Sequence, residues 1–134
     1  MKIPASLVKA YDLKDTSDLK VNDDLTITVC QHSGFNPLWS TRARDFIAKN
    51  PDHPACIDAG KFTATLGKDW NKEQIDFIAD VLVVSWESKE LGKYTPGNAR
   101  DLLNALPRLA ASVLTHGNNQ ATYENSEVEA ATGN

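Results

Sequence analysis

Apolar and polar residues alternate over residues 25–30 (LTITVC), the pattern of a β-strand with one buried face. The turn-forming residues 22–24 (NDD) come directly before this segment. We expect residues 6–13 to form its partner strand and the polar residues 14–20 to be a long mobile connection. A two-stranded ribbon is marginal alone, so it has to pack on helices or pair with another copy.

Helical spacing begins after residues 33–34 (SG). Asn36 and Pro37 are typical of an N-cap followed by the first helical position, where the missing N–H of proline costs nothing. One apolar stripe follows, formed by Trp39, Ala43, Phe46 and Ile47. Asn50 and Pro51 end this predicted helix. Residues 53–69 are ambiguous, and a short helix around 56–66 is one interpretation.

The longest predicted helix covers residues 72–89. It begins with residues 71–74 (NKEQ), which resemble a capping box. Its main apolar face consists of Ile75, Ile78, Ala79, Leu82, Val83 and Trp86, and Phe77, Val81 and Val84 widen it. A helix that is apolar over so much of its circumference is either the centre of the core or covered by another subunit. Gly92 is expected just past its end.

Two more helices complete the prediction. Thr95 and Pro96 repeat the cap-and-proline start, and a leucine-rich stripe follows over residues 99–106; Pro107 begins a last helix that ends at Gly117. The predicted fold class is α+β, mainly α-helical, with an N-terminal β-hairpin packed on a small helical bundle. We expect one globular domain over residues 1–117, with a β ribbon over 1–35 and helices over 36–117. Residues 118–134 are expected to be an acidic tail or a marginal helix.

The composition disfavours some classes of protein function. A chain of 134 residues suits one domain. Its 14 Lys and Arg against 18 Asp and Glu give a net charge of −4, which disfavours a nucleic-acid binder. No apolar run approaches the length of a membrane span, and the N-terminal residues lack the pattern of a signal peptide. We therefore expect a cytoplasmic protein that binds neither nucleic acid nor membrane.

Two Cys–His pairs are the candidates for metal binding. Cys30 lies two residues before His32, and His53 lies three residues before Cys56. Four nitrogen and sulfur ligands in two pairs is the number that structural zinc needs. The first pair is closer in sequence than is usual in zinc fingers, and Pro54 stiffens the second. Two thiols and two surface imidazoles are the favoured interpretation, and no metal or cofactor is predicted.

The sequence offers no catalytic constellation. Its seven glycines are scattered, so no phosphate-binding loop is present, and there is no nucleophile elbow. A Cys30–His32 nucleophile pair is conceivable, although nothing in the sequence orients it. Asp76 and Asp80 are four residues apart and could hold a hard cation, but such a pair is more often a solvated helix face. We predict a protein that is not an enzyme.

Three motifs in the second half suggest a family. Residues 81–87 (VLVVSWE) are an apolar run ending near a tryptophan, residues 94–99 (YTPGNA) join an aromatic residue to Thr-Pro and Asn, and residues 102–107 (LLNALP) are leucine-rich and end at a proline. In this order and spacing they resemble the tail assembly chaperones of long-tailed (siphovirus-type) bacteriophages and prophages. The helix entry at Asn36–Pro37 is also similar to that family, as is the acidic end that contains Asn119 and Tyr123.

The resemblance covers residues 25–134, most closely 81–134, and it has departures. The turn after Trp86 holds two lysines where the family usually has acids, and residues 53–69 match none of its motifs. For this sequence the resemblance implies a helix–helix corner in which Trp86 packs on Tyr94 and Thr95 caps the next helix. Trp86 is then either core or part of a partner-binding edge. The residues implied in partner binding are Trp86, Tyr94, Leu102, Tyr123 and Val128.

The family's function supplies the expected partners. The resemblance implies a chaperone in the host cytoplasm that binds the tape measure protein, keeps it soluble, assists polymerisation of the tail tube protein and leaves before the tail matures. It also implies self-association along an elongated client. The family often makes a longer form by −1 ribosomal frameshifting, and residues 132–134 (TGN) can be encoded by codons that contain a slippery heptamer; a simple C-terminus is the alternative. The alternatives are a head–tail connector or tail terminator subunit of the virion, and a host-directed regulator.

Overall fold

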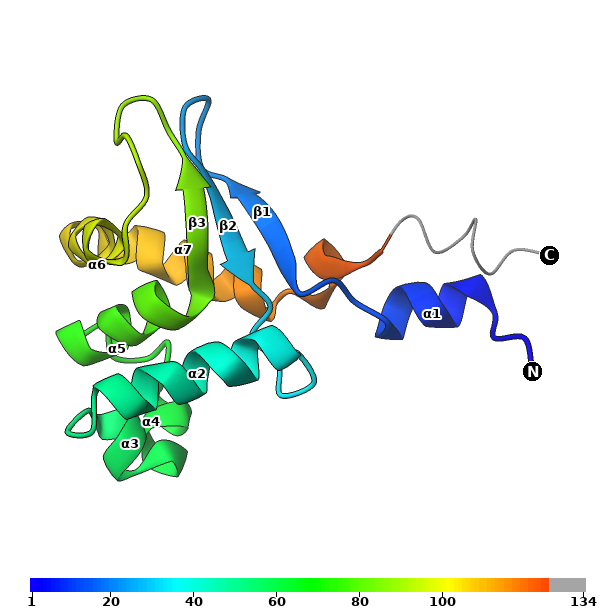
Figure 1. The fold of residues 1–134 in the computed structure, drawn as a ribbon, viewed down its shortest axis with the longest axis horizontal. Helices are drawn as coiled ribbons and strands as arrows, with labels where there is room; N and C mark the ends of the chain where they lie inside the picture. Colours follow the sequence, from blue (N-terminus) through cyan, green and yellow to red (C-terminus); the bar gives the residue numbers. More distant parts are fainter. Residues whose placement is uncertain (126–134) are drawn as a thin grey trace.

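The computed structural model describes residues 1–125, which form an α+β fold that is mainly helical, as the sequence predicts. In this part of the chain one antiparallel sheet has the order β1-β2-β3, with β1 at Thr16–Lys20, β2 at Thr26–Cys30 and β3 at Val83–Glu87. Helices pack below and behind the sheet (Figure 1). Val128 and residues 132–134 lie outside the described residues.

The first two strands form the predicted hairpin, and its turn is set by one side chain. Asn22 Oδ1 accepts hydrogen bonds from the backbone N–H groups of Asp24 and Leu25, at 2.9 and 2.6 Å. Along β2, Ile27 and Val29 are fully buried while Thr26 and Thr28 are partly exposed. The alternation of apolar and polar residues is therefore confirmed for this strand.

The partner of β2 was predicted in the wrong place. Residues 6–13 are not a strand: they contain most of helix α1 (Ala5–Tyr11). Residues 14–20 are not a loop: they contain β1, which pairs with β2 from Thr16 opposite Cys30 to Lys20 opposite Thr26. The polar β1 is stabilised by cross-strand contacts such as the Thr28 hydroxyl donating to Asp18 at 3.0 Å. Its single large apolar residue, Leu19, packs against the core.

The predicted starts of the helices are largely correct. Helices α2 (Pro37–Lys49) and α6 (Pro96–Ala105) begin with prolines, and Asn36 and Thr95 accept hydrogen bonds from Leu38 N and Asn98 N at 3.1 and 3.0 Å. Helix α7 covers Pro107–Asn118. The ambiguous stretch forms two short helices, α3 (Pro54–Ile57) and α4 (Ala59–Thr65).

The predicted 72–89 helix is wrong beyond its first half. Helix α5 covers only Lys72–Phe77, a π-helical turn follows over Ile78–Leu82, and the chain then extends as β3. Two features explain the change. The β-branched residues near 81–84 suit a strand, and β3 completes the sheet by pairing with β2, Ile27 lying opposite Trp86. Arg42 on α2 also donates to the backbone carbonyls of Asp80, Val81 and Val83, each at 2.8 Å, at the turn itself.

The core lies between the sheet and the helices, and the chain end closes it. Fully buried side chains come from β2, the π-helical turn, α6 and α7: Ile27, Val29, Ile78, Val81, Leu82, Leu103 and Val113. Helix α7 approaches β2 closely at Gly117, where an added Cβ would lie 3.4 Å from the carbonyl oxygen of Cys30. Beyond α7, the 3₁₀ turn η2 (Gln120–Tyr123) places Tyr123 in the core, fully buried.

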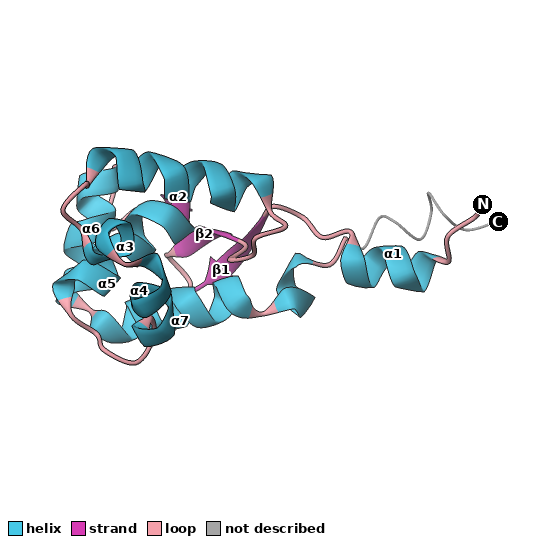
Figure 2. Cartoon of the chain, turned by 90° about the horizontal axis from the view of Figure 1, so that it is seen from below, coloured by secondary structure: helices cyan, strands magenta, loops and turns pink. Residues whose placement is uncertain are grey.

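Helix α1 projects from this body. Figures 1 and 2 show it at one end of the molecule, whereas α3 and α4 lie toward the other end. No residue of α1 is buried. Among the described residues, no helix is both long and apolar enough to cross a membrane.

Candidate functional site

Trp86 is the centre of the region that carries the three sequence motifs. It lies on β3 rather than at a helix end, and its side chain is 7% exposed. The indole N–H donates to the carbonyl oxygen of Gly92 at 3.0 Å, and its ring meets Tyr94 edge to face with centroids 5.4 Å apart. The predicted contact between Trp86 and Tyr94 is confirmed, but it joins a strand to a turn and not two helices.

The connection between β3 and α6, residues 88–95, is held in place from both sides. From the hairpin, Asp24 accepts hydrogen bonds from the Ser88 hydroxyl and from Lys89 N, the latter at 2.9 Å. The hydrogen bond from Ser88 is the main reason that the pKa of Asp24 is lowered. From the other side, the Tyr94 hydroxyl donates to Val83 O at 3.3 Å. Burial raises the pKa of Tyr94, so this hydroxyl stays protonated. The connection is therefore held in place by hydrogen bonds on both sides.

An apolar surface lies beside the connection between β3 and α6. A hollow of about 370 Å³ is lined by Trp86, Leu91, Asn98, Asp101 and Leu102. Leu91 is 41% exposed, and Leu106, the C-cap residue that follows α6, is 52% exposed. We call Leu91, Leu102 and Leu106 the α6 surface. Leu91 and Leu106 were not predicted as site residues, although the four-residue spacing of Leu102 and Leu106 was visible in the sequence.

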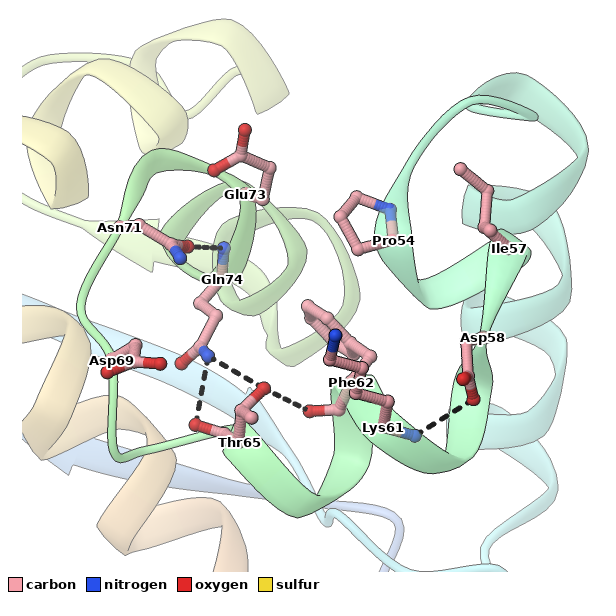
Figure 3. Close-up of a pocket in the computed structure, with 10 residues that line it drawn as sticks. All are labelled: Pro54, Ile57, Asp58, Lys61, Phe62, Thr65, Asp69, Asn71, Glu73 and Gln74. Carbon is pink, nitrogen blue, oxygen red and sulfur yellow. Dashed lines mark hydrogen bonds between the residues drawn. The ribbon is translucent and has the colours of Figure 1, made fainter.

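A larger hollow of about 620 Å³ lies between α3, α4 and α5 (Figure 3). Its apolar side is formed by Pro54, Ile57 and Phe62. Gln74, which is 2% exposed, donates to the carbonyl oxygen of Thr65 at 2.9 Å and accepts from Gly67 N at 3.1 Å. These bonds fix the loop that closes the hollow. Its acidic residues are Asp58, Asp69 and Glu73, and Lys61 is the basic residue that lines it.

The aspartates predicted as a possible cation site are paired with basic or amide groups. Asp80 forms a two-pronged ion pair with Arg100, whose Nε donates to it at 2.8 Å. This pairing is the main reason that the pKa of Arg100 is raised. Asp76 accepts from Lys72 at 2.7 Å and from the Asn104 amide at 2.8 Å. The two carboxylates thus tie α5 and the π-helical turn to α6.

The residues of the two Cys–His pairs have different structural environments. The Nδ1 of His53 accepts from Ala55 N at 3.0 Å, its Nε2 lies 2.8 Å from the carbonyl oxygen of Glu73, and its ring packs edge to face on Phe46 and Phe62. Cys30 is buried whereas Cys56 is exposed. Within residues 1–125 no group of three or more His, Cys, Asp or Glu residues is placed to hold a metal ion.

The geometry around Cys30 is not that of an activated nucleophile. Burial raises the pKa of the Cys30 thiol to about 11, so it is protonated at neutral pH. The side-chain amide of Asn36 donates toward its sulfur at 3.5 Å. His32 Nδ1 lies 2.7 Å from the Asn118 side-chain oxygen. The conceivable Cys30–His32 pair thus lacks the thiolate that nucleophilic chemistry requires.

The residues implied in partner binding have different environments. Trp86 and Tyr123 are buried, Tyr94 and Leu102 are half-buried, and Val128 lies outside the described residues. The structure brings Trp86, Tyr94 and Leu102 together at the α6 surface. Tyr123 instead contacts the other end of β2, where its hydroxyl donates to Val29 O at 3.2 Å. A partner role for these residues stays a prediction.

Comparisons of the chain with models of known protein families, with curated proteins and with solved structures found no match.

Proposed function

We propose that this protein is a tail assembly chaperone of a long-tailed bacteriophage or prophage. It binds the tape measure protein in the host cytoplasm, keeps it soluble and assists polymerisation of the tail tube protein around it. The observation that carries the proposal is that the three motifs behind the family resemblance form one structural unit. Residues 81–87, 94–99 and 102–107 supply β3, the anchored connection and α6.

The α6 surface suits a helical client. Leu91 and Leu106 are exposed and Leu102 is half-buried. Asp24, Tyr94 and Trp86 hold the connection beside them in place, so little ordering entropy is lost when a partner covers this surface. An amphipathic client helix presents apolar residues at spacings of three and four, which matches Leu102 and Leu106. In this arrangement Leu91, Leu102 and Leu106 touch the client, while Tyr94 positions the surface from beneath.

Charge around the surface favours a soluble complex. Asp101 lines the hollow with Leu91 and Leu102, and the segment that contains Leu91 carries Glu87, Lys89, Glu90 and Lys93. The mixture of signs keeps the surface hydrated when no client is bound, and the net charge of −4 opposes non-specific association. Several copies would be needed along an extended client, which is why self-association is part of the proposal.

Co-expression tests client binding directly. The tape measure protein should be recovered in the soluble fraction at several-fold higher yield when this chain is present. We expect it to be a long helical protein encoded in the same gene cluster. A Leu91→Asp, Leu106→Asp double variant should lose the effect, because it places charges where apolar contacts form. Val21→Asp is the matched control, since Val21 is 38% exposed in the hairpin turn. Equal client solubility with and without the chain would contradict the proposal.

The virion distinguishes the chaperone from a structural subunit. A head–tail connector or tail terminator remains in the finished particle, whereas a chaperone leaves it. Mass spectrometry of purified virions should therefore detect the tail tube and tape measure proteins but not this chain. Its presence at stoichiometric levels would favour the connector alternative.

A further inference from the structure

Helix α1 carries an exposed apolar face that the proposed client surface does not use. Leu7 and Tyr11 lie four residues apart on α1 and are 50% and 80% exposed, and Ile3, in the segment just before the helix, is 51% exposed. Phe35, which helps to line a hollow with Tyr11, is 99% exposed. Large apolar side chains gathered in this way on a projecting helix are typical of an interaction site.

The hollow between α3, α4 and α5 has the properties that such a helix needs. Its volume of about 620 Å³ is in the range of binding pockets, and Ile57 at its apolar side is 73% exposed. The wall is rigid because Phe62 is held among Phe46, His53 and Phe77, and because Gln74 fixes the closing loop. A side chain entering the hollow would meet pre-formed apolar contacts.

The two surfaces carry opposite charge. Residues 1–14 contain three lysines and one aspartate, a net charge of +2. The charged residues that line the hollow are three acids and one lysine, a net charge of −2. Opposite potentials favour the encounter of two surfaces and select their orientation. The apolar face of α1 and the acidic, apolar hollow are thus complementary in both properties.

The positions of the two surfaces decide the occupant. Helix α1 lies at one end of the molecule, and helices α3, α4 and α5, which line the hollow, lie toward the other (Figures 1 and 2), so α1 is not seated in the hollow of its own chain. We propose that α1 of one copy docks into the α3–α4–α5 hollow of a second copy. The contact is head-to-tail, so a pair leaves a free hollow on the first copy and a free α1 on the second, and repetition gives a ring or an open filament.

This contact specifies the self-association that the proposed function includes, but it involves no client. Head-to-tail repetition would place successive α6 surfaces along one assembly, as an elongated client requires. Its test uses the protein alone. Failure of the test would therefore leave client binding by the α6 surface standing, and failure of the co-expression experiment would leave the head-to-tail contact standing.

Two single variants separate the two halves of the contact. Leu7→Asp puts an acid on α1 that would face the acidic hollow. Ile57→Lys removes an apolar contact on the hollow side and lowers the net charge of the hollow from −2 to −1. Both side chains are at least half exposed, so neither change should unfold the protein, and circular dichroism and urea unfolding would verify this. In sedimentation velocity, the average mass of the species formed by the unmodified protein should rise with protein concentration, whereas each variant should stay a single chain. Val21→Asp is the control and should associate normally.

Mixing the two variants gives the decisive result. The Leu7→Asp copy keeps an intact hollow and the Ile57→Lys copy keeps an intact α1, so an equimolar mixture should form heterodimers and nothing larger. A symmetric α1–α1 contact predicts instead that Ile57→Lys associates alone and that the mixture gains nothing. Either that behaviour, or an unmodified protein that remains a single chain at every concentration, would overturn the proposal.

Discussion

Trp86 links the sheet to the connection that leads into α6. Its buried ring fills the space beside Tyr94, and its indole N–H holds the Gly92 carbonyl. Trp86→Ala should lower the free energy of unfolding by about 3–5 kcal/mol, because it leaves a large cavity. Trp86→Phe is the control: it keeps an apolar ring and should lose about 1–2 kcal/mol from the missing hydrogen bond. Urea unfolding measures both, and a Trp86→Ala protein of normal stability would place the side chain outside the core.

His116 makes the stability of the folded protein depend on pH. It lies against Tyr123, its Nε2 has no hydrogen-bond partner among the described residues, and burial lowers its pKa below the ordinary value of 6.5. Asp18 and a hydrogen bond at Ser17 oppose this shift only in part. Between the folded and unfolded pKa values the unfolded chain binds more protons, so the contribution of His116 is complete above pH 6.5 and is lost as the pH falls.

The expected result is a lower urea midpoint at pH 5.5 than at pH 7.5. In His116→Gln, which cannot take up the proton, the difference between the two midpoints should shrink. An unchanged difference would show that other groups cause the pH dependence.

The helix N-caps and the Trp86–Tyr94 contact could be predicted from the sequence, because each involves residues that are close together in the chain. Asn36, Asn71 and Thr95 all accept the backbone hydrogen bond expected of an N-cap. The exposed Leu91 was missed, because its role depends on how the hairpin residue Asp24 anchors the connection. Contacts between distant segments leave no local signal.

At the scale of elements, residues 72–89 show where periodicity fails. Their apolar residues fit a helix of one wide face and equally fit a short helix followed by a buried strand. What decides the structure is the partner: β2 offers an edge to β3, and Arg42 binds the three carbonyls at the turn. Both partners lie about 40 or more residues away in sequence, so the local pattern could not reveal them. The polar strand β1 was missed for a different reason: its sequence, TSDLK, has one large apolar residue and so no alternation of apolar and polar side chains.

Two glycines close together in sequence differ in backbone conformation: Gly92 lies in the connection after β3, and Gly97 lies in α6. Gly92 has φ of +73°, a backbone conformation that L-residues rarely adopt, whereas Gly97 in α6 does not, and an added Cβ would meet nothing within 4 Å at either. Gly92→Ala should therefore cost about 1–2 kcal/mol of backbone strain. Gly97→Ala should be neutral or stabilise α6 by up to about 1 kcal/mol. Thermal unfolding compares them, and equal midpoints would contradict the role given to Gly92.

For the whole molecule, the fold class could be predicted from the sequence, and the packed core also contains a residue beyond the predicted domain end at 117. The acidic composition after that point suggested a tail, since few apolar residues remain. One residue changes the outcome: Tyr123 is fully buried, and its burial raises the pKa of its hydroxyl. Hydrogen bonds also join the segment before β1 to η2: Lys14 N donates to Tyr123 O at 2.8 Å, and the side-chain amide of Gln120 donates to Ala10 O at 2.6 Å.

These contacts predict that the domain requires residues 119–125. A chain ending at residue 118 should lose about 3–5 kcal/mol of stability, because it removes the Tyr123 ring from the core and leaves the Val29 carbonyl without its donor. Tyr123→Phe separates the two effects, since it keeps the ring and should lose only about 1–2 kcal/mol. A chain ending at residue 125 retains every contact described for Tyr123 and is the length control. Urea unfolding of the three proteins should rank the 118-residue chain lowest; if it unfolds with the 125-residue chain, Tyr123 is not part of the cooperative core.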